Sequence, residues 1–298
     1  MCKKTMTLRQ YYKIHIKEIE TLIALALKED KVKNDVTTAL TFDKKSGNRK
    51  ISAILLCKQD GILAGIDMFK KVYKLINPKI SFRVSHKDGD SISRGNPVLE
   101  ITGPVKDLLT GERTALNFLQ RMSGIATLTH QFVSQLKYEG SSVLHTRKTT
   151  PNFRVFELAA VKIGGGQFHR YDLSSSVMIK DNHIIGWDSL DKALKNIHFK
   201  RLNRKLLKKF EVEVKSIKEL NIISEDYSDY IAVVMLDNFK PEAIGEAVNI
   251  LNKKGIKIEI SGGLNIENFK EMQYPGVDYY SVGMLTHSYK SLDFSLEF

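Results

Sequence analysis

The sequence contains few cysteines and no long apolar run. Its two cysteines, Cys2 and Cys57, are too few for a disulfide scaffold or a cysteine-based zinc site, and this scarcity suits a reducing compartment. No apolar run approaches the roughly 20 residues that a membrane-spanning helix needs. The opening segment "MCKKTMTLRQYYKIHIKEIE" holds no continuous apolar stretch resembling a signal peptide. We therefore expect a cytoplasmic protein with no membrane partner.

Motifs typical of several protein classes are also absent from the sequence. The histidines lack metal-type spacing such as HExxH, and neither cysteine lies in a nucleophile motif. Nothing resembles a helix-turn-helix, a zinc finger or an RNA-binding aromatic motif, although the formal net charge of +12 would suit nucleic acid. Much of this charge lies in scattered lysines, and we interpret the basic run at 199–209 as an exposed amphipathic helix face. The balance favours small polyanionic substrates over nucleic acid.

The 298 residues have room for one large domain, or for a large and a small one, and the texture of the chain changes once. The first part mixes the helical segment "IKEIETLIALALKED" with β-like runs, which are "KISAILLCKQDGILAG", "ISFRVSHKDGD" and "NPVLEITGP". A long helical pattern follows from about residue 105 to residue 136. Gly124 interrupts this pattern, so one helix and two helices are both open.

The rest of the chain repeats a short apolar strand, a polar residue at its end, and a helix. The strand centres lie about 22 to 34 residues apart, the length of a β-α unit. Six such units in series predict a parallel sheet, either open or closed into a barrel. Functional side chains at all the strand ends favour the barrel, because a doubly wound sheet binds its ligand at a single switch point. The predicted strands are "SVLHTRK", "SVMIKD", "FEVEV", "YIAVVMLDN", "KIEISGG" and "DYYSVGML".

Residues 145–183 form a strongly cationic stretch. It holds six Lys or Arg and three His, against only three acidic residues. Such a run is usually a solvated basic surface. Here, however, Arg147 follows "SVLHT" and Lys180 ends "SSSVMIK", so both cations come at the ends of predicted strands, where α/β folds present ligands. We therefore expect this stretch to bind one or more anions.

Acidic residues and glycines end the other predicted strands. Glu213 and Asp237 close "FEVEV" and "VVMLD", and Glu211 alternates with valine, so that it shares a strand face with Glu213. Burying acids inside a barrel costs free energy unless they meet a cation, a metal or sugar hydroxyls. Pairing of one of these acids with a neighbouring lysine is the simpler alternative and stays open. "SGG" at 261–263 and "SVG" at 281–283 suit either a phosphate site or two ordinary turns. Strand ends that carry cations, acids and glycines in this way suit a substrate with several carboxylates beside a phosphorylated sugar with magnesium-bound pyrophosphate.

Eight motifs follow one another along the chain: "GERTALNFLQRMSGIATLT", "HTRKTTP", "GGGQFHRYDL", "MIKDNHI", "EVEV", "MLDNF", "EISGGL" and "GVDYYSVGMLTHS". In this order they resemble the quinolinate phosphoribosyltransferase family, the carboxylating nicotinate-nucleotide pyrophosphorylases. The resemblance implies an N-terminal α/β sandwich domain at 1–115, on which the tail at 288–298 packs. At 116–287 it implies a partly open α/β barrel of about six parallel strands, the type II phosphoribosyltransferase fold. It also implies a homodimer, which in some members assembles into a hexamer.

The resemblance also implies which residues form the site. Glu213 and Asp237 would hold the ribose hydroxyls and the magnesium ion with its pyrophosphate, and catalytic roles fall on these two acids and Lys148. Arg113 would enter the quinolinate pocket from the neighbouring subunit. The residues that match the family's cationic pocket are Thr146, Arg147, Lys148, His169, Arg170 and Lys180, and those that match its phosphate loops are Ser261, Gly262, Gly263 and Gly283.

The implied reaction joins quinolinate to phosphoribosyl pyrophosphate and yields nicotinate mononucleotide, pyrophosphate and carbon dioxide, as in de novo NAD biosynthesis. Asn34 stands where the family often has glycine before "VTT", which leaves that turn's geometry open. Two other functions stay open: a paralogous phosphoribosyltransferase-like protein associated with molybdate transport, and a basic binding protein without catalysis. The complete set of "TRKT", "HR" and Lys180 favours the enzyme over the paralogue.

Overall fold

The computed structural model describes residues 6–203 and 210–298, and the chain divides into two compact units. The first unit comprises Met1–Gln131, Lys148–Phe168 and Leu285–Phe298, and the second comprises Phe132–Arg147 and His169–Met284. The basic run at 199–209 lies outside the residues whose side chains are described, so its interpretation as a helix face stays a prediction. The domain boundary between residues 115 and 116 also stays a prediction.

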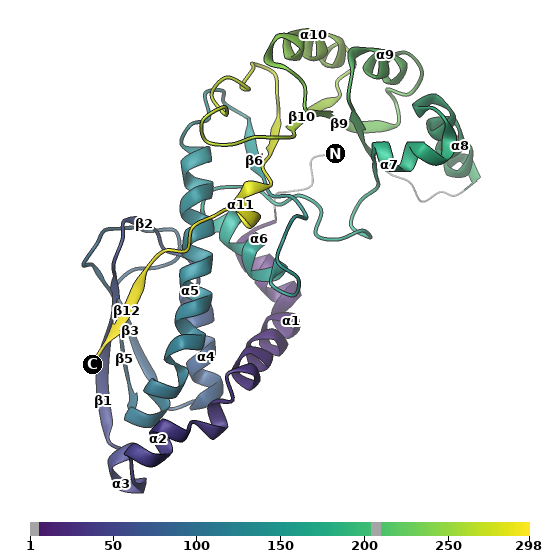
Figure 1. Cartoon of the computed structure of the whole chain (residues 1–298). Coiled ribbons are helices and arrows are strands. Elements are labelled where there is room, and N and C mark those ends of the chain that lie inside the picture. The colour runs from purple at the N-terminus through teal and green to yellow at the C-terminus, as the bar shows by residue number, and fades with distance from the viewer. Residues whose placement is uncertain (1–5, 204–209) are drawn as a thin grey trace. The chain divides into compact units, whose positions relative to one another are not determined.

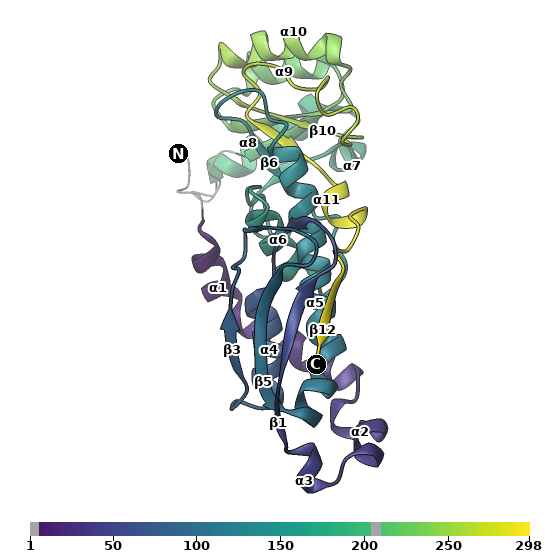
Figure 2. The same ribbon diagram turned by 90° about the vertical axis from the view of Figure 1, so that its left-hand side faces the viewer.

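The first unit combines an antiparallel sheet with a layer of helices. Its sheet contains, in spatial order, β12 (Phe294–Glu297), β1 (Lys50–Cys57), β5 (Pro97–Pro104) and β3 (Ser81–Val84), while β2 (Gly61–Ile62) pairs with β4 (Ser91–Ile92). Its helices are α1 (Leu8–Glu29), η1 (Val32–Asn34), α2 (Val36–Thr41), α3 (Lys44–Gly47), α4 (Ile66–Ile76), most of α5 (Val105–Val133) and α6 (Arg154–Ile163). Figures 1 and 2 show α4 and α5 on one face of the four-stranded sheet, and α1 packs against α4 and α6.

The two-residue period of β1 decides which of its side chains enter the core. Leu55 and Cys57 are buried, whereas Ile54, which precedes Leu55, is 45% exposed, and Leu56 is half-buried. β12 lies antiparallel beside β1, with Leu55 opposite Leu296 and Cys57 opposite Phe294. Phe294 and Leu296 are buried as well, so the C-terminal strand extends the same apolar face.

Local sequence determines where α1 begins and which face it buries. Thr7 caps the helix: its Oγ1 accepts a hydrogen bond from the Gln10 N–H at 3.2 Å, and the Gln10 side chain accepts one from the Thr7 N–H at 2.9 Å. Ile19, Ile23 and Leu27 recur every four residues and are buried. The helix is thus fixed at its start by a capping box and along its length by one apolar stripe.

The turn that contains Asn34 does not require a glycine. Asn34 ends η1, and its N–H donates to the Lys31 carbonyl at 2.7 Å. Lys31, with a φ of 50°, is the residue of this turn with a left-handed conformation. Asp35 then caps α2 by accepting from the Thr38 N–H at 3.0 Å.

α5 is one continuous helix, although Gly124 in the sequence was equally compatible with two helices. The glycine allows another segment of the first unit to pass close by: a Cβ on Gly124 would lie 2.3 Å from the carbonyl oxygen of Lys290. One turn earlier, the Gln120 carbonyl accepts a hydrogen bond from the Leu292 N–H at 3.1 Å. Gly124 therefore serves a close backbone approach rather than a break.

The second unit is built on a six-stranded sheet in which every pairing is parallel. Its strands, in spatial order, are β6 (Ser142–Leu144), β11 (Tyr279–Ser281), β10 (Lys257–Ser261), β9 (Ile231–Asp237), β8 (Phe210–Val214) and β7 (Met178–Ile179). The first strand in the chain thus lies beside the last, as in a barrel. No pairing within the described residues joins β6 to β7, so the barrel is open there. The predicted strands and the partly open α/β barrel are confirmed.

The helices of the second unit connect these strands. They are α7 (Asp181–Ile184), η2 (Ile185–Trp187), α8 (Leu190–Asn203), α9 (Ile217–Asp226) and α10 (Pro241–Asn252), and α11 (Met284–His287) crosses the boundary between the units. α9 and α10 lie side by side on one side of the strands in both views (Figures 1 and 2). α10 buries Ile244, Val248 and Leu251. Within the described parts of the chain, no helix combines the length and the apolarity needed to cross a bilayer.

Asp88 is a half-buried carboxyl of the first unit at the start of α4. Its Oδ1 accepts hydrogen bonds from the N–H groups of Gly65 and Ile66, both at 2.9 Å. Burial is the largest influence on this carboxyl and, together with the charge of Asp67, outweighs those hydrogen bonds. The pKa of Asp88 therefore rises from 3.8 to about 6. Asp88 caps the helix but is costly to ionise.

Asp88→Asn should change how stability depends on pH. Because the folded-state pKa is raised, the folded protein binds more protons than the unfolded chain between about pH 4 and pH 6, and stability is lost as the pH rises through this window. Asparagine keeps an oxygen acceptor and does not ionise. Relative to wild type, the variant should gain about 1–2 kcal/mol of unfolding free energy between about pH 4 and pH 7, measured by urea denaturation. A difference that does not vary with pH would contradict this.

Candidate active site

Predicted site residues of the second unit meet at the carboxyl ends of the parallel strands. Asp237, the last residue of β9, lies opposite Ser261 at the end of β10, and Ser261 lies opposite Ser281 at the end of β11. Gly283 follows two residues beyond β11, and Glu213 lies one residue before the end of β8. Since neighbouring parallel strands end at the same edge of a sheet, these residues share one rim.

Arg147 and Arg170 of the second unit lie close enough for the charge of Arg147 to act on Arg170. Burial, and after it the positive charge of Arg147, lowers the pKa of Arg170. Three acids near Arg170 act in the opposite direction, namely Glu211, Glu213 and Glu259. A half-buried pair of like charges is unfavourable by itself and becomes favourable when an anion binds between them. This arrangement supports the predicted anion site.

His145, to which the sequence assigned no role, holds the backbone of the "HR" dipeptide. It is 1% exposed, and its Nε2 lies 3.0 Å from the backbone nitrogen of His169. Because a backbone N–H can only donate, Nε2 carries no proton, and Nδ1 is the donor to the Thr146 carbonyl at 3.2 Å. His145 is therefore neutral and connects the end of β6 to His169 and Arg170.

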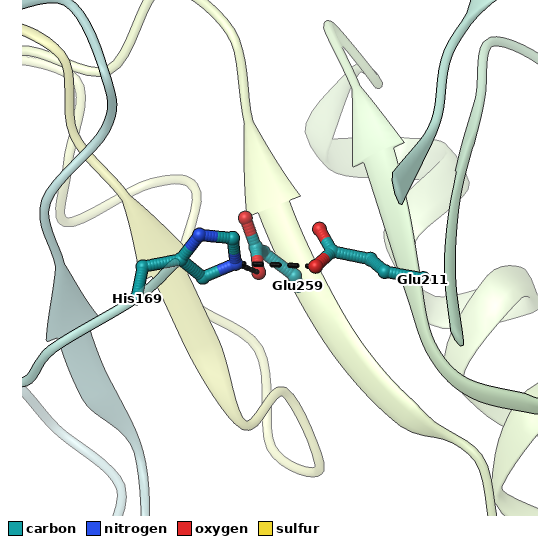
Figure 3. A group of neighbouring side chains, drawn as sticks. All are labelled: His169, Glu211 and Glu259. Carbon is teal, nitrogen blue, oxygen red and sulfur yellow. Dashed lines mark hydrogen bonds and ion pairs between the residues drawn. The ribbon is translucent and has the colours of Figure 1, made fainter. Parts of the chain in front are cut away.

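Two glutamates from separate strands approach the same edge of the His169 ring (Figure 3). Its Nε2 lies 3.1 Å from Oε2 of Glu211 on β8 and 3.5 Å from Oε2 of Glu259 on β10. Burial by itself would lower the pKa of His169, but the hydrogen bonds and charges of the two glutamates outweigh it and raise the pKa to about 10. His169 is therefore a cation at neutral pH.

Glu213 and Lys180 form an ion pair at the same rim. The Glu213 side chain is 6% exposed and the Lys180 side chain 36%. Pairing of a rim acid with a neighbouring lysine, which the sequence left open, is thus present, and the lysine is itself a predicted pocket residue. The pair brings together the end of β7 and the end of β8.

The turns after β9 and β10 pass very close to each other. Asn238 has a left-handed φ of 54°, and Gly262 and Gly263 have φ values of 94° and 61°. A Cβ on Gly262 would lie 2.4 Å from Oδ1 of Asn238 and 2.8 Å from its backbone nitrogen. Asn238 also donates through Nδ2 to Oδ2 of Asp237 at 3.0 Å. A glycine at 262 therefore allows the predicted phosphate loop to lie beside the predicted acidic site.

Arg113 and Lys148 belong to the first unit, unlike the other predicted site residues. Arg113 lies on α5 with 73% of its side chain exposed, 3.5 Å from the neighbouring Glu112. Lys148 is exposed, and its carbonyl accepts a hydrogen bond from Thr286 Oγ1 at 2.8 Å. The roles of Arg113 and Lys148 stay predictions.

A buried acid fixes the loop that follows Lys148. Glu157 is fully buried, and its Oε2 accepts from the Thr150 N–H at 3.1 Å. Arg121 donates to Oε1 of Glu157 at 3.4 Å and to Thr150 Oγ1 at 3.0 Å. These contacts, all within the first unit, fix both the backbone and the side chain of Thr150 in the "KTTP" segment.

Glu211 and Glu259, the two buried acids beside His169, were not assigned a role from the sequence. Glu211 was recognised as an inward acid, but no partner was assigned to it. Glu259 interrupts the apolar strand "KIEIS" in the way that the acids interrupt "FEVEV". The same alternation argument, applied to this strand, would have identified it.

Two family models match the chain over most of its length. The model "Quinolinate phosphoribosyl transferase, N-terminal domain" matches residues 35–123, and "Quinolinate phosphoribosyl transferase, C-terminal domain" matches residues 125–297. Together with the open six-stranded barrel, these matches define the class as the phosphoribosyltransferases.

Similar proteins of known name identify one family within this class. The chain is 41% identical over 268 residues to the "Probable nicotinate-nucleotide pyrophosphorylase [carboxylating]" of Archaeoglobus fulgidus, covering 88% of this chain and 97% of that protein. It is 37% identical over 256 residues to the "Nicotinate-nucleotide pyrophosphorylase [carboxylating]" of Rattus norvegicus, covering 85% and 83%. The solved structure of NadC from Streptococcus pyogenes matches with a TM-score of 0.85 at 39% identity, covering 94% and 96%. The chain belongs to the quinolinate phosphoribosyltransferase family, which confirms the predicted resemblance.

Gly262→Ala should be more harmful than the same change at a glycine with similar backbone geometry. Gly140→Ala is the control, because Gly140 has a φ of 87° and nothing within 4 Å of its Cβ position. Both changes place a Cβ in a left-handed conformation, at a cost of about 1 kcal/mol. Overlap with Asn238 should lower the unfolding free energy of Gly262→Ala by about 1–3 kcal/mol more, measured by urea denaturation. Equal stability of the two variants would refute the close approach.

Proposed function

We propose that this chain transfers the phosphoribosyl group of phosphoribosyl pyrophosphate to quinolinate, with loss of carbon dioxide, to give nicotinate mononucleotide and pyrophosphate. The observation that carries the proposal is the like-charged pair Arg147 and Arg170 on a barrel rim that also presents Glu213 and Asp237. Relatives at 35–41% identity bear names for this activity. The product is an intermediate on the de novo route to NAD.

The cationic side of the rim suits quinolinate, which carries two adjacent carboxylates. Arg147 and Arg170 each present a planar fork of N–H groups that matches a carboxylate in two-point contacts. His169 adds a third positive charge, Thr146 precedes Arg147 after the end of β6, and Lys180 follows β7. A dianion bound here would relieve the repulsion between the two arginines.

The acidic side of the rim suits the phosphoribosyl donor. Glu213 and Asp237 lie on the same face of neighbouring strands, where carboxylates can accept hydrogen bonds from ribose hydroxyls. The backbone beside Ser261, Gly262, Gly263 and Gly283 would bind the phosphate at the ends of the last two strands.

Glu213 and Asp237 also fit a magnesium ion, because hard carboxylate oxygens are the ligands that it prefers. In the described residues, Lys180 contacts Oε2 of Glu213 and Asn238 contacts Oδ2 of Asp237, so each carboxylate keeps a further oxygen for the metal. When bound with the donor, magnesium neutralises the charge of the departing pyrophosphate. These two residues would hold it, directly or through water.

The chain's contribution to the chemistry is orientation and placement of charge. As the bond to pyrophosphate breaks, the ribose carbon gains positive character, which the carboxylates of Glu213 and Asp237 stabilise. The pyridine nitrogen of quinolinate, oriented by the arginines, then forms the new bond to that carbon. The positively charged ring accepts the electron pair left when the adjacent carboxyl departs as carbon dioxide, and a proton takes its place. Lys148 is the proposed catalytic cation beside the departing charge.

Assembly and compartment belong to the same proposal. A homodimer, possible also within a hexamer, would let Arg113 of one subunit enter the pocket of the other, in keeping with its exposure on α5. Cytoplasmic location is proposed because the two cysteines suit a reducing compartment.

An assay with quinolinate labelled at the carboxyl that is lost tests this function. The purified chain, supplied with phosphoribosyl pyrophosphate and magnesium, should release labelled carbon dioxide and form nicotinate mononucleotide in equal amounts, and a chelator should stop both. The molybdate-associated paralogue and a non-catalytic binding protein both predict that no carbon dioxide is released. Absence of both products from folded protein would sink the proposal.

Variants of the two sides of the rim should fail in opposite ways. Arg170→Lys removes a two-point contact and should weaken the binding free energy of quinolinate by about 2 kcal/mol, which raises its dissociation constant roughly 30-fold. Donor binding should stay close to wild type. Asp237→Asn should leave quinolinate binding intact and lower turnover strongly, because it removes a charge that stabilises the ribose carbon. Calorimetry with each substrate alone, beside turnover, measures both. The reverse pattern would exchange the two assigned sides.

Mixed dimers test whether Arg113 acts across subunits. Arg113→Ala and Lys148→Ala should each abolish activity alone. If Arg113 serves its partner, a mixed dimer holds one site with both faults and one with neither, so random re-association of equal amounts restores about a quarter of wild-type sites. The two variants, carrying different tags, are unfolded, refolded together and assayed. No recovery in dimers that carry both tags would mean that Arg113 serves its own chain.

A further inference from the structure

Glu211 and Glu259 are deeply buried acids that the proposed chemistry does not use. Their side chains are 8% and 1% exposed. Among the described residues, Oε1 of Glu211 and both oxygens of Glu259 have no hydrogen-bond partner. Burial of such carboxylates is strongly unfavourable unless a cation lies beside them. The cation that contacts both is His169.

The contacts of His169 separate its two ring nitrogens. Both glutamates approach Nε2, one from β8 and one from β10, as Figure 3 shows. The backbone N–H is held separately by His145 at 3.0 Å. Within the described part of the chain Nδ1 makes no hydrogen bond, so its N–H can donate to a ligand. A ring flip would place Cε1 where Nε2 lies and break both contacts at once.

We propose that Glu211 and Glu259 are positioning residues, a dicarboxylate clamp that fixes the His169 ring so that Nδ1–H donates to a carboxylate of quinolinate. This inference rests on the proposed function, since it concerns how one pocket residue is held. The clamp acts through His169 and does not touch the substrate. A hydrogen bond to Glu211 and an ion pair with Glu259, on different strands, restrict the ring more tightly than one contact could.

Electrostatics agree with this geometry. The glutamates raise the pKa of His169 to about 10 against the effect of burial, so both ring nitrogens carry protons at neutral pH. A neutral ring would leave one nitrogen without a proton, and the clamp would then compete with the substrate for a single N–H group. The charged ring can satisfy both partners.

A divalent metal is the main alternative occupant of this cluster. One ligand atom from each of His169, Glu211 and Glu259 lies within 4.8 Å of the others. The 3.1 Å separation of Nε2 from Oε2 of Glu211 suits a hydrogen bond, and it equally suits two neighbouring ligands of one metal ion. A metal would require the deprotonated imidazole. The protonation state of Nε2 therefore distinguishes the two occupants.

Binding of quinolinate alone gives the first test. Glu211→Gln and Glu259→Gln should each weaken it about ten- to a hundredfold, the range for loss of a hydrogen bond to a charged group, with donor affinity near wild type. Glu259→Asp, which keeps the charge, should restore part of the loss. Asp278→Asn is the control: this carboxylate of the same sheet accepts from the Ile258 N–H at 2.9 Å, at the opposite end of β10. Wild-type quinolinate affinity in both glutamine variants would overturn the clamp.

A double-mutant cycle asks whether the glutamates act through His169. In the His169→Ala background, the two glutamine changes should weaken quinolinate binding little further, because the group that they hold is gone. Losses that add fully to that of His169→Ala would show direct contributions to binding and would overturn the positioning role.

Nitrogen NMR of the wild-type protein, labelled in histidine, measures the protonation of His169 without a change to either glutamate. His169, assigned from its absence in His169→Ala, should show both ring nitrogens protonated at pH 7.5, with Nδ1 shifting when quinolinate is added. A deprotonated Nε2, or broadening of the His169 signals by Mn²⁺ alone, would establish the metal alternative and overturn the clamp. This reading is independent of turnover: failure of the carbon dioxide assay removes the proposed function, whereas an active wild type with unaffected glutamine variants removes only the clamp.

Discussion

Buried acids that point into the open barrel need cations beside them, and this requirement determines which side chains lie together at the rim of the second unit. Glu211 and Glu259 are matched by His169, and Glu213 is matched by Lys180. His169 connects its loop to β8 and β10, and Lys180 connects the residue after β7 to β8, so these pairs also fix the positions of the strand ends. The positive charge of Arg147, by contrast, disfavours the charged form of Arg170, and an anion bound beside both would remove this repulsion. His169 and Lys180 thus pair with acids of the same unit, whereas the two arginines are proposed to bind a ligand.

Backbone precision at the rim comes from short-range contacts that leave little freedom. The close turns at Asn238 and Gly262 require the absence of a Cβ, and His145 holds the backbone of His169. In the first unit, Glu157 does the same for the segment after Lys148. Orienting two charged substrates is a task for rigid groups, since misplacement by a fraction of an ångström weakens every charged contact. The acids and glycines around the site therefore serve geometry as much as charge.

The sequence predicted the strands well because each is an apolar run with a polar end, repeated at the length of a β-α unit. The inward direction of Glu211 and Glu213 also followed from alternation with valine. Which cation each acid meets did not follow, because the pairing of Glu213 with Lys180 depends on register between strands 33 residues apart in sequence. Gly124 illustrates the same limit. A glycine within a helical pattern suggests a break, whereas here it makes room for a segment more than a hundred residues later.

The pairing of β12 with β1 has a consequence for the order in which the molecule can be completed. The first unit draws on three separate stretches of the chain, and its edge strand β12 (Phe294–Glu297) follows the whole of the second unit in the sequence. During synthesis, one edge of β1 therefore stays without its neighbour until the second unit has emerged from the ribosome. Unpaired strand edges are sites of misassembly. Loss of β12 would therefore leave the sheet of the first unit without one edge strand, although the rest of that sheet is synthesised much earlier.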